Sequence, residues 1–276
     1  MPPDLKVACL QNCATDDVAA NIAICTDMAR AAHAQGARML LLPEHFSAMY
    51  PNDAAAAATA VEEDAHPALA AFRALAAELG VWILMGSIAV RLASGKVNNR
   101  SCLLAPDGQV VARYDKIHLF DVRLRGAESY RESATVAAGG RAVLAPTPWG
   151  ALGMTVCYDV RFAYLYRTLA RAGAAFLAIP AAFTHQTGLA HWHVLVRARA
   201  IETGCYVFAP GQCGTRPWGR RTFGHSLIVD PWGEVLADGG TEPGFILADV
   251  DPARVTQARS MIPALEHDRT VAAPSS

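Results

Sequence analysis

The sequence predicts an α/β layered fold, and three observations support this. Short apolar, β-branched runs alternate along the chain with longer stretches that have the apolar spacing of helices. Hydrophobic residues make up 53% of the 276 residues, so the chain can form a large core without a disulfide or a metal. Two segments with turn residues between strand-like runs predict β-hairpins. We therefore expect a single domain, residues 1–276, in which helices pack on sheets.

The strands and helices follow from local patterns. The strand-like runs are LKVACLQ, ARMLLLPE, VWILMGSIAV and AAFLAIPAAF. Helical spacing predicts four main helices, over residues 16–34, 66–79, 162–172 and 188–203. Asp16, Asp17 and His66-Pro67 are suitable helix starts, and Gly36 and Gly80 are suitable ends.

The hairpins and the C-terminal segment complete the pattern. Pro106-Asp107-Gly108 joins the first pair of strand-like runs, and Asp230-Pro231-Trp232-Gly233 joins the second. The Ala-rich segment 54–60 is either a surface loop or a helix. Residues 251–276 begin with a helix-like piece and continue as a tail with few core residues. We expect this tail to pack on something else or to be disordered at its end.

Composition and charge exclude several classes of function. The chain has 24 basic and 25 acidic residues and no run of like charges, which argues against a surface for nucleic acid or for an anionic membrane. No apolar stretch reaches the roughly 18 residues of a membrane helix, and MPPDLKVACLQNC lacks the pattern of a signal peptide. The seven cysteines include no C-x-x-C pair, which favours reduced thiols and a cytoplasmic location.

Glu44 follows the apolar run MLLLP, where the chain leaves the core. In open α/β sheets, functional groups gather beyond the carboxyl ends of strands. A half-buried carboxyl group there would have a raised pKa, which suits a general base that works near neutral pH. An isolated glutamate is more often a helix cap or a surface carboxylate, so Glu44 alone is not a specific signal.

Lys116 and Cys157 also follow strand-like runs. Apolar residues follow Lys116, so we expect its ammonium group to turn inward, where it can stabilise negative charge on a carbonyl oxygen. Cys157 lies between a strand and a helix-like segment that begins near Arg161. At such a turn, backbone N–H groups lower a thiol pKa and bind an oxyanion. Taken alone, however, a lysine at a strand end is usually a solvated charge, and a cysteine there is usually inert.

Taken together, these three residues are much more specific. Their order and their surroundings, LLPEHF, YDKIHLFD and CYDVRF, resemble the three signature motifs of the nitrilase (carbon–nitrogen hydrolase) superfamily. The resemblance extends from VACLQN to IPALEHDR, which is nearly the whole chain. GLAHWHVLVRARAIETGCYVFAPGQCG and RRTFGHSLIVDPWGEVLAD are most similar to the Nit amidase branch, whose members act on deaminated glutathione or on ω-amides of 2-oxo acids.

The resemblance implies a four-layer αββα sandwich that pairs into an αββα–αββα homodimer, with a C-terminal arm reaching the partner. It also implies that Glu132, in the segment SYRES, is a fourth catalytic residue that orients the lysine and the substrate. Tyr158, Arg161 and Phe183 lie in family-like motifs near the cysteine, and we expect them to shape the substrate pocket.

The resemblance implies a mechanism in which Cys157 forms a thioester with the acyl group of a small carboxylated amide. Glu44 takes the thiol proton and returns it to the leaving ammonia. Lys116 and the backbone N–H of Tyr158 stabilise the oxyanion. The products are an acid and ammonia, and this mechanism requires no metal or organic cofactor.

The sequence departs from the family pattern in two places. Relatives commonly have Glu at the position of His193, where it helps to form the wall or the hydrogen-bond network of the site. His185, His191 and His193 suggest metal ligands, but residues two apart on a helix point in different directions, so a structural role is favoured. Arg123 and Arg125 stand where many relatives have an acidic residue and a proline. They are either part of a solvated loop or a site for a substrate carboxylate.

Three alternative functions stay open. N-carbamoyl amino acid hydrolases use the same Glu, Lys and Cys as the amidases. A nitrilase that acts on R–C≡N is disfavoured because YDVRF, after Cys157, differs from the WEN-type pattern of those enzymes. The third alternative is a catalytically silent scaffold of the same fold, which would have no chemical need to keep a nucleophile, a base and an oxyanion-binding cation together.

Overall fold

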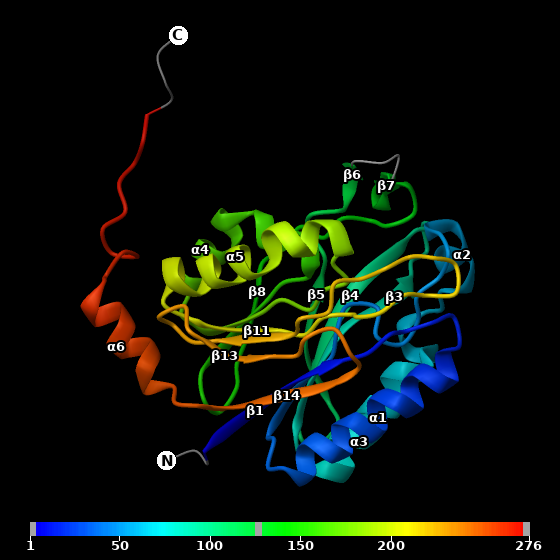
Figure 1. Cartoon of the computed structure of the whole chain (residues 1–276), viewed down its shortest axis with the longest axis horizontal. Helices are drawn as coiled ribbons and strands as arrows, with labels where there is room; N and C mark the ends of the chain where they lie inside the picture. The colour runs from blue at the N-terminus through cyan, green and yellow to red at the C-terminus, as the bar shows by residue number, and fades with distance from the viewer. Residues whose placement is uncertain (1–3, 125–128, 273–276) are drawn as a thin grey trace.

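Two six-stranded sheets form the frame of the protein. Figure 1 shows the computed structural model, which describes residues 4–124 and 129–272. The first sheet has the strand order β14-β1-β2-β3-β4-β5, in which β1, β2 and β3 are parallel. Its strands are β14 (Gly244–Val250), β1 (Leu5–Gln11), β2 (Met39–Leu41), β3 (Trp82–Arg91), β4 (Val97–Leu104) and β5 (Val110–Asp115).

The second sheet has the order β13-β12-β11-β10-β9-β8, in which β9, β10 and β11 are parallel. Its strands are β13 (Val235–Asp238), β12 (Leu227–Val229), β11 (Tyr206–Ala209), β10 (Ala174–Ala178), β9 (Ala151–Met154) and β8 (Val143–Ala145). Each sheet therefore combines a parallel centre with antiparallel outer strands.

Helices cover the outer face of each sheet (Figure 1). The first sheet carries α1 (Val18–Ala34) and α3 (Pro67–Leu79), and the second carries α4 (Ala163–Arg171) and α5 (His185–Thr203). The smaller elements are α2 (Asp53–Thr59), η1 (Glu63–Ala65), β6 (Asp121–Arg123), β7 (Ser129–Arg131), η2 (Glu132–Ala134), η3 (Cys157–Arg161) and α6 (Ala253–Met261). The Ala-rich segment is thus a helix, α2.

The packing of β1 shows why the layers form. Val7 and Cys9 belong to the core cluster that also contains the strands of the second sheet, whereas Ala8 and Leu10 belong to the cluster that contains α1 and α3. Successive side chains of a strand point to opposite faces, so a strand buried on both sides contributes to both cores. The predicted αββα sandwich is confirmed.

Local chemistry accounts for several helix ends. Asp17 caps α1 by accepting a hydrogen bond from the Ala20 backbone N–H at 3.0 Å. Gly80 ends α3 in the left-handed conformation, with φ of 64°. Helix α5 begins at residue 185, three residues before the predicted start, because the side chain of Thr184 caps it by accepting from the Thr187 backbone N–H.

The last part of the chain contacts α4. Asp268 forms ion pairs with Arg167 at 2.9 Å and with Arg171 at 2.8 Å. Val271, by contrast, is 87% exposed. Residues 273–276, the end of the predicted tail, lie outside the described residues. Among the helices of the described ranges, none is both long and apolar enough to cross a membrane.

Candidate active site

The ends of three strands bring the predicted catalytic residues together. Strands β2 and β5 run in the same direction within the first sheet, so Glu44, three residues after β2, and Lys116, directly after β5, lie at the same edge. Cys157 follows β9 of the second sheet and faces this edge. Glu44 Oε2 accepts a hydrogen bond at 2.9 Å from the backbone N–H of Ala182, which follows β10, so both sheets build the site.

Lys116 lies between two carboxylates. Its Nζ is 2.9 Å from Glu44 Oε1 and 2.9 Å from Glu132 Oε2. Glu132 opens η2, and its Oε2 also accepts from the Phe120 backbone N–H at 2.6 Å. Glu132 is therefore fixed by its own contacts, and it can orient the ammonium group of Lys116.

Cys157 has a backbone conformation that is uncommon for residues other than glycine. Its φ is 51°, in the left-handed region, and its backbone N–H donates to the Pro180 carbonyl at 2.8 Å. Asp159 stabilises this turn by accepting from the Val156 backbone N–H at 2.8 Å and from the Tyr114 hydroxyl at 2.7 Å. A residue held in this conformation at a strand-to-helix turn presents its side chain at the strand end, as a nucleophile requires.

Burial and charge set the protonation states of the site. Burial raises the pKa of Glu44, but the positive charge of Lys116, with His45 and hydrogen bonds from Cys157 and Lys116, lowers it to a net value of about 2. The expectation of a half-buried Glu44 with a raised pKa is therefore wrong, because this fully buried carboxylate has a cation beside it. Burial lowers the pKa of Lys116, but the charges of Glu132 and Glu44 raise it well above its ordinary value.

The thiol of Cys157 stays protonated in the free protein. Burial raises its pKa, the negative charge of Glu44 raises it further, and the positive charge of Lys116 offsets only part of this effect. The expectation that the turn lowers the pKa of this thiol is therefore wrong. The resting site thus contains a thiol, a carboxylate that accepts its hydrogen bond, and an ammonium group.

Sequence reasoning missed Asn99, which links the two carboxylates. The Asn99 amide nitrogen donates to Glu44 Oε1 at 2.9 Å and to Glu132 Oε1 at 3.2 Å. Asn99 is in the middle of β4, where it is 1% exposed. The available signal was the Asn98-Asn99 pair inside a strand-like run, because a buried strand seldom keeps two amides without partners for them.

A cavity opens above the four residues. Tyr158 and Phe183 line it, as predicted for pocket residues. The described lining does not include Arg161, whose guanidinium lies over the rings of Tyr158 and Phe183, 5.8 and 5.5 Å from their centroids. Arg123 is at the end of β6 and is likewise absent from the described lining, and Arg125 lies outside the described residues.

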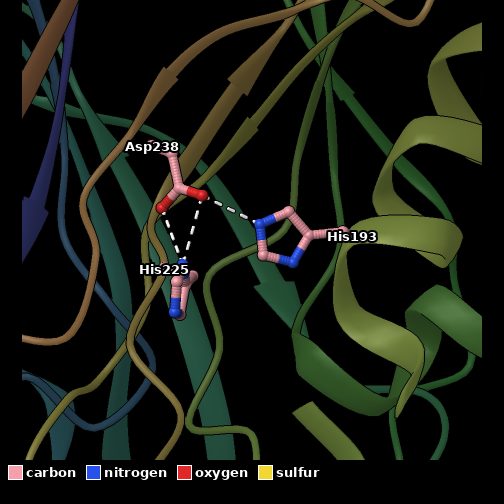
Figure 2. Close-up of side chains that lie close together, drawn as sticks. All are labelled: His193, His225 and Asp238. Carbon is pink, nitrogen blue, oxygen red and sulfur yellow. Dashed lines mark hydrogen bonds and ion pairs between the residues drawn. The ribbon is translucent and has the colours of Figure 1, made fainter. Parts of the chain in front are cut away.

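The structure places His193 in a different cluster, shown in Figure 2. Its Nε2 is 2.9 Å from Asp238 Oδ2, and His225 Nδ1 is 2.9 Å from Asp238 Oδ1. None of the three is in the described lining of the cavity. The side chain of His191 points elsewhere and contacts Arg161 at 3.3 Å, so the H-x-H pair does not converge. His193 thus joins α5 to the end of β13 through a hydrogen bond between residues 45 positions apart in the sequence.

A buried thiol, a carboxylate and an ammonium group thus lie together on an αββα sandwich. Residues 6–260 match the family model described as carbon–nitrogen hydrolase, and the chain belongs to that family. It is an enzyme of the amidase type, and the predicted nitrilase-superfamily membership is confirmed.

Comparisons with individual proteins agree with this assignment. A Synechocystis protein named deaminated glutathione amidase is 43% identical over 97% of this chain and 98% of its own length. The crystal structure of the C. elegans NitFhit protein has a TM-score of 0.88 at 34% identity; the match covers 96% of this chain and 65% of that longer chain. A mutant Nesterenkonia amidase, with a TM-score of 0.79 at 27% identity over 93% of this chain and 94% of its own, carries the acetamide moiety of fluoroacetamide on its active-site cysteine.

Proposed function

We propose that this enzyme hydrolyses the amide of deaminated glutathione, or of a closely related 2-oxo acid, through a thioester on Cys157. The observation that carries the proposal is the contact of the buried Cys157 thiol with Glu44, beside Lys116, at the base of the cavity. The name of the Synechocystis relative supports the choice of substrate.

The first half-reaction forms the acyl-enzyme. Glu44 takes the thiol proton as sulfur attacks the amide carbon, and the carbonyl oxygen becomes an oxyanion beside Lys116 Nζ and the backbone N–H of Tyr158. When this intermediate collapses, the C–N bond breaks and Glu44 gives its proton to the departing nitrogen. The acyl group is left as a thioester on Cys157.

The second half-reaction releases the acid. Glu44, again a carboxylate, takes a proton from a water molecule as the water oxygen attacks the thioester carbon. Collapse of the second oxyanion breaks the C–S bond, and the proton on Glu44 returns to sulfur. Glu132 holds Lys116 in place through both steps by accepting a hydrogen bond from its ammonium group. Asn99 holds Glu44 and Glu132 in place by donating a hydrogen bond to each.

The leaving group depends on the substrate. An ω-amide of a 2-oxo acid releases ammonia. In deaminated glutathione the amide nitrogen belongs to a cysteinylglycine unit, so the nitrogen leaves as the amine of that dipeptide. The two cases are measured separately, by an ammonia assay and by detection of cysteinylglycine.

The test is product release by the wild type and by Cys157→Ala on deaminated glutathione, 2-oxoglutaramate, an N-carbamoyl amino acid and a nitrile. Turnover of an amide that is lost in Cys157→Ala supports the proposal. Cys13→Ala, at a half-buried cysteine away from the cavity lining, is the matched control and is expected to keep wild-type turnover. Activity only on the carbamoyl compound would replace the proposal with the N-carbamoyl hydrolase.

We also propose that the chain forms a homodimer and works in the cytoplasm. Apolar side chains on the outer helical layer support the dimer, since Val194 and Ile201, seven residues apart on one face of α5, are 67% and 55% exposed. The seven cysteines, all of them unpaired, support a reducing compartment.

A further inference from the structure

A second cavity adjoins the catalytic cavity. Four residues line both of them: His45, Ala56, Ala89 and Arg220. His45 directly follows Glu44, so the two cavities meet beside the carboxylate that must protonate the departing nitrogen. The catalytic mechanism uses neither Arg220 nor the second cavity.

Among the residues that the structure describes, Arg220 is a cation without a carboxylate partner at this junction. Within residues 4–124 and 129–272, its side chain forms no hydrogen bond or ion pair, and its Nε is buried without a hydrogen-bond partner. The guanidinium lies 5.2 Å from the centroid of the Tyr130 ring, which fixes its position without neutralising its charge. The other cation of the catalytic cavity, Lys116, already lies between Glu44 and Glu132. A carboxylate that enters this junction would therefore be bound by Arg220.

His66 provides an independent sign that the second cavity binds a polar group. It lines that cavity and is 8% exposed, yet its Nδ1 has no hydrogen-bond partner in the described part of the chain. It stands at the start of α3, where its side chain makes no capping hydrogen bond. A buried ring nitrogen left without a partner is costly, and a polar ligand in the cavity would satisfy it.

We propose that the second cavity is the subsite for the amine portion of the substrate, and that Arg220 binds a carboxylate carried by that portion. The chemical class is a secondary amide whose nitrogen bears a short, carboxylated, peptide-like group. This inference rests on the proposed function, because it assigns the two sides of the scissile amide to the two cavities. The acyl group occupies the catalytic cavity, and the departing amine extends past His45 to Arg220 and His66.

The experiment compares two amides with the same 2-oxo acyl group. One is the primary amide 2-oxoglutaramate, which releases ammonia, and the other is deaminated glutathione, which carries a carboxylate on the amine side. The measured quantity is the ratio of kcat/KM for the secondary amide to kcat/KM for the primary amide. We expect Arg220→Gln to lower this ratio by about tenfold or more, mainly through KM of the secondary amide, because a charge-assisted hydrogen bond is lost.

Arg221→Gln is the matched control, since this neighbouring arginine is exposed and absent from the described lining of both cavities. It is expected to leave the ratio as in the wild type. His66→Phe keeps a ring of similar size but removes the nitrogen, and it is expected to lower the ratio about threefold or more. Thermal unfolding of each variant shows whether the fold is kept.

An unchanged ratio in Arg220→Gln, or an equal loss on both amides, would overturn the subsite. If the wild type turns over neither amide, the proposed function fails. In that case the subsite is tested by calorimetry, which measures the binding of deaminated glutathione to Cys157→Ala. Binding that Arg220→Gln weakens by tenfold would support the subsite, and binding that is absent or indifferent to Arg220 would overturn it.

Discussion

Glu44 Oε1 lies 2.9 Å from Lys116 Nζ, and the two side chains are only 4% and 2% exposed. Both charges are therefore held away from water, and each depends on the other for compensation. The pair joins the segment after β2 to the end of β5, so it is at once an element of the fold and of the site.

Lys116→Met, which keeps the length of the side chain but removes its charge, tests this double role. We expect turnover to fall by about 10²-fold to 10³-fold, because the oxyanion loses its cation. We also expect the free energy of unfolding to fall by about 3–5 kcal/mol, since Glu44 and Glu132 remain buried without it. The measurements are kcat/KM and urea unfolding. Lys96→Met, at an exposed lysine, is the control and should change neither quantity appreciably.

Alkylation of Cys157 by iodoacetamide should be strongly pH-dependent in the free enzyme. Its pKa is raised by burial and by Glu44, so the thiolate, which is the reactive form, increases with pH beyond the ordinary range of a cysteine. We expect the rate at Cys157 still to be rising at pH 9, as followed by mass spectrometry of its peptide. A plateau below pH 8 would contradict the protonation state derived from the structure.

Asn99→Ala removes a positioning residue without touching the nucleophile. Glu44 and Glu132 each lose a hydrogen bond from the Asn99 amide, so we expect kcat to fall by about tenfold or more while KM changes less. The pH profile of kcat should also move, because Glu44 then loses a donor that favours its charged form. Asn99→Gln, which can restore the donor, should recover part of kcat. A variant that is merely less stable, with an unshifted profile, would argue against this role.

Gly188→Ala tests the close approach of α5 to Phe223. A Cβ at residue 188 would lie 2.1 Å from Phe223 Cγ, so the helix or the ring must move. We expect a loss of about 1–3 kcal/mol in the free energy of unfolding, measured with urea. Gly140→Ala, where a Cβ meets no atom within 4 Å, is the control and should fall within about 0.5 kcal/mol of the wild type.

Val194→Glu tests the proposed homodimer. A charge on the exposed apolar face of α5 should shift the protein toward the monomer in light scattering coupled to size-exclusion chromatography. Val111→Glu, at a 42% exposed position on β5, provides a comparison outside the helical layer and should leave the oligomer intact. A wild type that elutes as a monomer at micromolar concentration would contradict the proposal directly.

Local signals predicted much of the fold. The cap at Asp17, the glycine at the end of α3 and the turn at Asp107-Gly108 act over a few residues, and each lies where the sequence indicates it. The positions of Glu44, Lys116 and Cys157 could be predicted because each follows a strand. The protonation of Glu44 could not, since the cation that lowers its pKa comes from a distant strand.

Other parts of the site depend on packing between distant segments. Asn99 and Arg220 line the same cavity only because folding brings β4 and the segment after β11 together. Their contribution to the site therefore cannot be predicted from either segment alone. The position of His193 also depends on a distant segment, because its hydrogen-bond partner Asp238 lies 45 residues further along the chain. The spacing of residues within one segment does not predict contacts between segments that are far apart in the sequence.

The division of the site between two sheets also affects how activity arises during refolding. Glu44 and Lys116 belong to one sheet and Cys157 to the other, so neither half holds a working set of groups. Helices and hairpins form from near neighbours and can appear early, whereas this site exists only after the sheets have docked face to face. During refolding, turnover would therefore return later than the circular dichroism signal of secondary structure. The time at which turnover returns would measure when the two sheets dock.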